Sequence, residues 1–200
     1  MDDNRKQAFD GWTKFLKPEV LKGNLITASI FLAAYETLCA SVIGRLRDFY
    51  SFGFNADGPI IDEKYETQVL SLDKSDFRAS LLWLKENSAI DDSDIAKIDQ
   101  IRQHRNDLAH ELPKYLLTAN TDIDVNLLVA MYDILTRIDR WWIQEVELPT
   151  NPDYDGIEIA DDDIISGSML FIQMMIRIAT GADSAIYWEE FQKQAGSVFV

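Results

Sequence analysis

Residues 24–50 read NLITASIFLAAYETLCASVIGRLRDFY and form a long, mostly apolar stretch. Its apolar residues recur at helical spacing, and Asn24 at its start belongs to a residue type that caps helix N-termini, so we expect one long helix that ends near Tyr50. The segment Leu25 to Ile43 is also the part of the chain most like a membrane span. Because Glu36 stands inside that segment and a central charge is costly in lipid, we expect a buried bundle helix and no membrane association.

Further segments show helical periodicity, and each is bounded by a residue type that caps or breaks helices. They are Lys6–Leu16 before Pro18, a helix capped by Ser75, a helix capped by Ser93 and ended by Pro113, a helix from Asp122 that stops before Pro149, Ile164–Ala179 before Gly181, and a short last helix from Asp183 or Ser184. Residues 51–72 have no sustained period and predict a long loop or short elements. The fold class is therefore expected to be all-α, a helical bundle with additional C-terminal helices.

Charge and composition narrow the function classes. The chain has 200 residues and a formal net charge of −15. Binding of duplex DNA across a broad basic face is not expected, because that mode neutralises many phosphates with Lys and Arg, whereas a small pocket with one or two arginines is compatible. One cysteine, Cys39, and two histidines, His104 and His110, are too few for a thiolate or imidazole metal cage. We expect no metal, no cofactor and, since the N-terminus lacks a secretory pattern, a cytoplasmic location.

The pattern with the clearest chemistry is IRQHRNDLAHELP, residues 101–113. Its residues follow the alternating spacing of three, four and three positions that is typical of the buried face of a bundle helix, which we call the seam. This spacing places an arginine at a seam position. The seam positions are Ile98, Ile101, Arg105 and Leu108. Arg105 is followed directly by Asn106 and then, after three more residues, by His110. This arrangement resembles the Arg-x4-6-His signature of the HEPN superfamily, and the resemblance covers roughly residues 24–147.

The resemblance implies a metal-independent endoribonuclease of a toxin or phage-defence type. In such an enzyme the 2′-hydroxyl of RNA attacks the adjacent phosphate, which requires a proton carrier and positive charge beside the phosphorane. His110 suits the first role, Arg105 suits the second through its bidentate fork, and Asn106 would orient the phosphate or the ribose. An acidic side chain inside an apolar helix is rarely buried without a partner, so we expect Glu36 to orient Arg105 or His110, or else to be an exposed residue or an ion-pair partner of Arg45, Arg78 or Arg102. Arg102 would add to a local basic pocket. The implied partners are RNA, a second copy of the chain and an antitoxin or defence-system protein.

Helix geometry separates the arginine from the histidine. Five residues at about 100° each place Arg105 and His110 about 140° apart around an ideal helix. Either the helix unwinds at residues 109–110, which Pro113 favours, or the pair faces a groove between two chains. We expect a dimer with two-fold symmetry. The residues expected at its interface are Ile101, Arg105, Leu108 and either Trp141 or Trp142.

Two alternatives to the ribonuclease remain open. In the first, Arg105 is an interhelical salt-bridge residue and His110 a helix C-cap, and the chain is a catalytically silent interaction or nucleotide-binding module. In the second, residues 151–162 carry oxygen ligands and a glycine near EF-hand spacing, and the chain is a calcium-responsive adaptor. For all of these readings we expect a bundle over residues 1–147, an acidic loop over residues 148–163 and C-terminal helices over residues 164–200 packed on the same domain.

Overall fold

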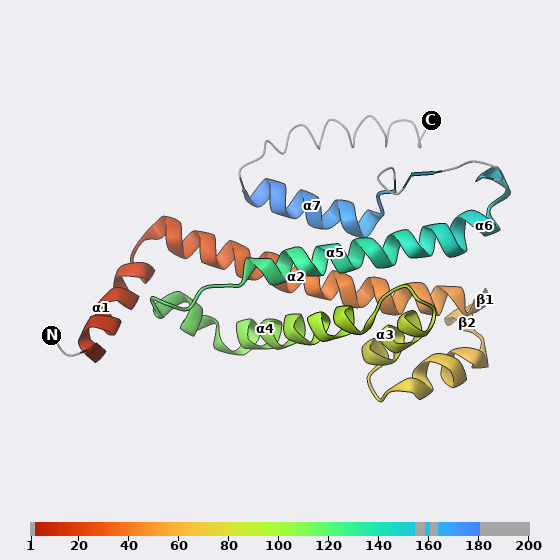
Figure 1. The fold of residues 1–200 in the computed structure, drawn as a ribbon, viewed down its shortest axis with the longest axis horizontal. Coiled ribbons are helices and arrows are strands. Elements are labelled where there is room, and N and C mark those ends of the chain that lie inside the picture. Colours follow the sequence, from red (N-terminus) through yellow and green to blue (C-terminus); the bar gives the residue numbers. More distant parts are fainter. Residues whose placement is uncertain (1–2, 155–158, 161–163, 181–200) are drawn as a thin grey trace.

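The computed structural model describes residues 3–154, 159–160 and 164–180. This part of the chain is mostly helical, as the sequence predicts, and adds one small hairpin (Figure 1). The helices are α1 (Asp3–Phe15), α2 (Pro18–Phe49), α3 (Asp76–Glu86), α4 (Asp92–Leu117), α5 (Val125–Trp142), α6 (Leu148–Thr150) and α7 (Gly167–Ala179), and the strands are β1 (Ser51–Asn55) and β2 (Gly58–Ile61).

The three long helices α2, α4 and α5 lie side by side and form the body of the bundle (Figure 1). α7 lies against α2 and α5, and α1 contacts α2 and α4 at the end of the bundle where α4 finishes. The hairpin and α3 lie at the opposite end. The predicted seam is confirmed, because Ile98, Ile101 and Leu108 are buried against the neighbouring helices.

The central helix α2 begins earlier than expected. Pro18 occupies its first turn, where a fixed φ and a missing N–H are tolerated, so the prediction that Asn24 caps this helix was wrong. Among the described residues, α2 is the single helix that is long and apolar enough to cross a membrane by length and composition, with a mean hydropathy of 1.7 over its most apolar window. One third of that stretch is buried in the bundle (33%), and the core helix of a bundle can be equally long and apolar.

The sequence predicted the N-cap of α3 correctly and the N-cap of α4 incorrectly. Ser75 caps α3 as expected, and its Oγ accepts a hydrogen bond from the N–H of Arg78. The cap of α4 is Asp91 and not Ser93. The Asp91 carboxylate accepts hydrogen bonds from the N–H groups of Ser93 (2.8 Å) and Asp94 (3.0 Å), while the Asp94 carboxylate accepts one from the N–H of Asp91. This reciprocal arrangement satisfies N–H groups that the first turn leaves without partners.

The prediction that Pro113 ends the fourth helix is confirmed only in part, because regular helical geometry is interrupted at Glu111, two residues before Pro113, and a second helical segment follows. α4 continues to Leu117, with Pro113 inside it. The backbone departs from helical geometry at Glu111, whose φ of −123° and ψ of 28° produce a kink instead of a stop. α4 is therefore helical through His110 and bends immediately after it.

α1 closes this end of the bundle. The Lys14 Nζ donates hydrogen bonds to the carbonyl oxygens of Thr118 (3.2 Å) and Thr121 (2.7 Å), beyond the last turn of α4. Gly11 is buried where α1 crosses that turn, and a Cβ at this position would lie 1.9 Å from the carbonyl oxygen of Leu117. Only glycine allows the two backbones to approach this closely.

The segment expected as a loop or short elements contains an antiparallel hairpin and short helical turns. β1 and β2 are joined through Ala56 and Asp57, and Gly58 has a φ of +125°, which favours glycine. A π-helical turn (Tyr65–Val69) and a 3-10 turn (Leu70–Leu72) follow before α3. The hairpin was not predicted.

Both ends of the helix expected from Asp122 to a stop before Pro149 differ from expectation. α5 begins after its N-cap Asp124, and a π-helical turn (Ile143–Glu147) leads from α5 directly into α6, whose first turn holds Pro149. The stop before Pro149 was therefore wrong. α7 begins after Ser166, its N-cap, and the expected roles of Gly181, Asp183 and Ser184 lie outside the described residues.

The prediction of the residues that form the dimer interface was also wrong in part. Ile101, Leu108 and Trp142 are 0%, 1% and 3% exposed, because they pack in the core of their own chain. Trp141 is half-buried against the same core. A second copy would therefore have to contact other side chains.

Candidate functional site

Arg105 points from α4 towards α2 and is held by three neighbours. Its Nη2 donates a hydrogen bond to Glu36 Oε1 at 2.6 Å, and its Nη1 donates one to Asn106 Oδ1 at 3.3 Å. Its Cζ lies 5.5 Å from the centre of the Tyr35 ring, within range of a cation–π contact. The Nε of Arg105 is buried and has no hydrogen-bond partner among the described residues. The guanidinium is thus fixed in one orientation while its side chain remains 31% exposed.

Glu36 does pair with an arginine, as its position in an apolar helix suggests. Its side chain is 59% exposed and lies at the edge of α2, so it reaches Arg105 from the surface and not from inside the core. Of the pairings that the sequence left open, the structure therefore shows the one with Arg105.

His110 lies on an exposed part of α4, in the last turn before the kink at Glu111. No hydrogen bond or ion pair joins it to another residue in the part of the chain that the structure describes. Because α4 keeps helical geometry through His110, the alternative in which the helix unwinds at residues 109–110 was wrong. Arg105 and His110 consequently point about 140° apart, and a single copy of the chain does not bring them together.

Arg102 lies one turn before Arg105 and lines a pocket of about 300 Å³ between α3 and α4. Across this pocket, Arg78 Nη1 pairs with Asp99 Oδ2 at 2.9 Å. Arg102 Nη2 contacts the other oxygen of Asp99 at 3.5 Å, and its side chain is 59% exposed. The sequence predicted Arg102 as a supporting cation but gave no sign of the pocket, since α3 and α4 meet only in three dimensions.

Cys39 and Tyr35 lie beside the guanidinium of Arg105 without being activated as nucleophiles. Burial raises the pKa of the Cys39 thiol to about 11, and burial also raises the pKa of the Tyr35 hydroxyl above its ordinary value. Both groups stay protonated at neutral pH. A covalent mechanism through either side chain is therefore disfavoured, because the thiolate or phenolate is the reactive form.

His104, the second histidine of α4, is built into the packing between helices. Its Nε2 accepts a hydrogen bond from the N–H of Asp124 at 3.2 Å. Its ring lies edge to face with Phe31 (5.0 Å between centroids) and with Tyr115 (5.6 Å). Burial lowers the pKa of His104 below its ordinary value. His104 is therefore neutral at pH 7 and ties α4 to the start of α5.

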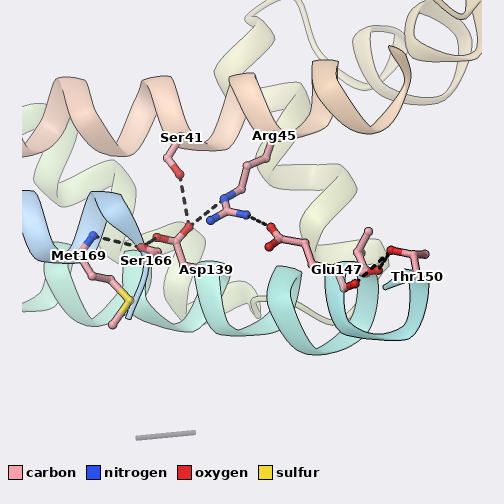
Figure 2. Close-up of polar contacts among 8 residues, drawn as sticks. Ser41, Arg45, Asp139, Glu147, Thr150, Ser166 and Met169 are labelled. Carbon is pink, nitrogen blue, oxygen red and sulfur yellow. Dashed lines mark hydrogen bonds and ion pairs between the residues drawn. The ribbon is translucent and has the colours of Figure 1, made fainter. Parts of the chain in front are cut away.

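Figure 2 shows a polar cluster that the sequence did not predict. Asp139 of α5 is fully buried and accepts hydrogen bonds from Ser41 Oγ (3.3 Å) and Ser166 Oγ, and it pairs with Arg45 Nε at 3.1 Å. Arg45 also pairs with Glu147 Oε1 at 2.6 Å. These contacts join α2, α5 and the start of α7. One sequence signal was available, since an aspartate directly follows Ile138 on the apolar face of α5.

The expected calcium loop lies partly outside the described residues, since residues 155–158 and 161–162 are not among them. In its described part, Asn151 Oδ1 accepts a hydrogen bond from the N–H of Asp153 at 3.1 Å. Within the described ranges, no group of three or more His, Cys, Asp or Glu side chains is placed to hold a metal ion.

Comparison of the chain with models of protein families, with curated proteins and with solved structures finds no match. The resemblance to the HEPN superfamily therefore stays a prediction, carried by Arg105, Asn106 and His110.

Proposed function

We propose that this chain is a metal-independent endoribonuclease whose active site combines Arg105 of one copy with His110 of a second copy. The observation that carries the proposal is the environment of Arg105. Its guanidinium is fixed by Glu36 and Asn106, yet it stays accessible. A buried N–H without a hydrogen-bond partner costs about 1–3 kcal/mol. Because the Nε of Arg105 is such a group among the described residues, a purely structural role would leave this cost without compensation.

The chemistry follows from these side chains. The terminal nitrogens of Arg105 have further N–H donors beyond those used by Glu36 and Asn106, and these would bind the non-bridging oxygens of the scissile phosphate. His110 would accept the proton of the 2′-hydroxyl as the bond from the 2′-oxygen to phosphorus forms. The bond from phosphorus to the 5′-oxygen then breaks, the departing oxygen takes up a proton from water, and the protonated His110 returns its proton to the solvent. The products are a 2′,3′-cyclic phosphate and a 5′-hydroxyl.

A second copy is needed because α4 is helical from its start through His110. Among the described residues, no hydrogen bond or ion pair holds the exposed His110 imidazole, so the Arg105 of a partner could approach it. An interface with two-fold symmetry would create two equivalent sites, each with an arginine from one copy and a histidine from the other.

RNA cleavage in excess EDTA tests this function. The wild-type chain should cut RNA, leave 2′,3′-cyclic phosphate ends and spare DNA, which has no 2′-hydroxyl. The His110→Ala and Arg105→Ala variants should each lose roughly two orders of magnitude in rate or more. Gln103→Ala is the matched control, because Gln103 is exposed on the same helix and bonds only to Asp107 among the described residues. Full cleavage by folded His110→Ala protein would overturn the proposal.

The second candidate is a catalytically silent interaction or nucleotide-binding module, and the ion pair between Glu36 and Arg105 favours it because the pair neutralises the arginine. Glu36→Gln separates the two functions. In a ribonuclease the variant should cleave RNA about tenfold more slowly, because Arg105 loses its orientation. In a silent module neither protein cleaves RNA. Stability should change by about 1 kcal/mol or less in both cases, because Glu36 lies at the surface and water screens the pair.

A further inference from the structure

We propose that the pocket of about 300 Å³ between α3 and α4 is a subsite that binds the nucleotide next to the scissile phosphate of a single RNA strand. The inference rests on the proposed ribonuclease function, since it places the pocket beside Arg105. The pocket has an apolar lining from Phe77, Leu81 and Ile98 and charged groups from Asp73 and Arg102. Its volume is at the lower end of the range of about 300–1,000 Å³ that is typical for small-ligand sites.

The pocket neighbours Arg105 through two of its lining residues, Arg102 and Phe77. Arg102 and Arg105 are three residues apart on α4, so their Cβ atoms lie about 5–6 Å apart on the same side of the helix. Phe77, which lines the pocket, packs edge to face with Tyr35 at 6.1 Å between centroids, and the Tyr35 ring lies against Arg105. A strand with one phosphate at Arg105 can therefore place its neighbouring nucleotide in the pocket.

Arg102 is the group suited to the next phosphate. Among the described residues it hydrogen-bonds to Asp99 at 3.5 Å, the outer limit of such a bond, and its side chain is largely exposed. Asp99 is already paired with Arg78 at the shorter distance of 2.9 Å. The planar fork of Arg102 is thus available to phosphate oxygens without breaking the bridge between α3 and α4.

Phe77 and Asp73 suit the base. The aromatic ring offers a surface on which a base can pack, a contact that every base can make. Asp73 Oδ1 accepts a hydrogen bond from the N–H of Ser75 at 2.9 Å, which leaves its other oxygen for a donor on the base. A carboxylate accepts from the amino group of cytosine, whereas uracil carries a carbonyl oxygen at that position, which a carboxylate repels. The subsite should therefore prefer cytidine to uridine.

The local charge permits this binding in an acidic protein. The two arginines of the pocket offset its two aspartates, so the pocket is formally neutral within a chain of net charge −15. An RNA strand would meet less repulsion there than over the rest of the surface. Because the strand would be held by few cations, its affinity should depend only weakly on salt.

Fluorescence anisotropy with fluorescein-labelled 12-nucleotide oligocytidylate and oligouridylate tests the subsite. The parent protein is the His110→Ala variant, which we expect to bind RNA and to cut it at least about a hundredfold more slowly than wild type. Adding Arg102→Gln should weaken the binding of both strands about tenfold and should lower the slope of log affinity against log salt by about 0.7, the value for one phosphate contact on a single strand. Arg102→Lys should keep the slope and part of the affinity. Lys97→Gln, on the same helix but outside the pocket, should change neither quantity.

The base preference supplies an independent readout. The parent protein should bind oligocytidylate about fivefold more tightly than oligouridylate, the effect of one added hydrogen bond. Asp73→Asn should remove this preference, while its amide oxygen preserves the bond to Ser75. Equal binding of the two strands by the parent protein, no RNA binding by the parent, or an unchanged affinity and salt slope in Arg102→Gln would each overturn the subsite.

The two proposals fail separately. If wild-type protein does not cleave RNA but binding depends on Arg102 and Asp73, the ribonuclease is wrong and the nucleotide site stands. If cleavage depends on His110 while Arg102→Gln leaves KM and kcat unchanged, the subsite is wrong and the ribonuclease stands.

Discussion

His104 and His110 lie on the same helix, six residues apart, in very different surroundings. His104 packs between Phe31 and Tyr115 and accepts a backbone hydrogen bond, while His110 is exposed. Only a neutral ring nitrogen can accept a hydrogen bond, so His104 contributes to stability in its unprotonated form. His110 makes no such contact among the described residues, and in the proposed mechanism it is the proton carrier.

We expect His104 to make the stability of the protein depend on pH. Its pKa in the folded chain is lowered below the value of about 6.5 that it has when unfolded, so the unfolded chain binds more protons in that window. The contribution of His104 is present above pH 6.5 and is lost as the pH falls below it. In urea unfolding, the stability of wild type relative to His104→Gln should decrease from pH 7.5 to pH 5.5. A difference that stays constant or grows would contradict this role.

At the scale of elements, apolar periodicity predicted the helices well because each long helix buries one face. It gave the seam of α4 and the cap at Ser75 correctly. Prolines caused the errors at the ends of helices, because Pro18 and Pro149 lie in first turns and Pro113 is absorbed by a kink. The hairpin escaped prediction because its strands are short and β1 leaves Phe52 and Phe54 exposed.

The candidate site could be predicted only in part. Sequence spacing identified Arg105, Asn106 and His110 together with the angle between them, because all three belong to one helix. It could not select Arg105 as the partner of Glu36, because that choice depends on how α2 and α4 are rotated against each other. The buried Asp139 cluster was missed for the same reason, since its members come from three separate parts of the chain.

The crossing of α1 over the end of α4 should be sensitive to a single methyl group. Gly11→Ala places a Cβ against the carbonyl oxygen of Leu117, so the two helices must separate and the hydrogen bonds of Lys14 must weaken. We expect a loss of about 2–3 kcal/mol in the free energy of unfolding, measured with urea. Gly23→Ala in α2 is the control, because nothing lies near its Cβ position, and it should be neutral or stabilise by up to about 1 kcal/mol. Equal effects of the two substitutions would contradict this account of the crossing.

The Asp139 cluster should hold α7 on the bundle. Asp139→Ala removes the acceptor of Ser166 and the buried partner of Arg45, which we expect to cost about 3–5 kcal/mol. Hydrogen exchange should rise first in α7, whose N-cap loses its support. Asp133→Ala, an exposed residue of the same helix, should leave exchange in α7 unchanged. Unaltered protection of α7 in folded Asp139→Ala protein would show that other contacts hold this helix.

At the scale of the whole molecule, the net charge of −15 opposes both dimerisation and RNA binding. Added salt should strengthen dimerisation and weaken the phosphate contacts of bound RNA. Repulsion between two copies is screened as ionic strength rises, and the screening length is about 10 Å at 0.1 M. Phosphate contacts with Arg102 and Arg105 weaken over the same range. Light scattering at tens of micromolar should therefore show a dimer that becomes tighter with salt. A chain that stays monomeric at every salt concentration would exclude a site shared between two copies.

The central claim, a site shared between two copies, is tested most directly by mixing two inactive variants. Arg105→Ala and His110→Ala protein, each inactive alone, should regain RNA cleavage in EDTA when they are combined. About half of the dimers would then pair one variant with the other, and each such dimer would hold one intact site of two, so the mixture should show about one quarter of the wild-type activity. If wild type is active and the mixture stays as inactive as its components under conditions where the copies exchange, Arg105 and His110 do not act across two chains.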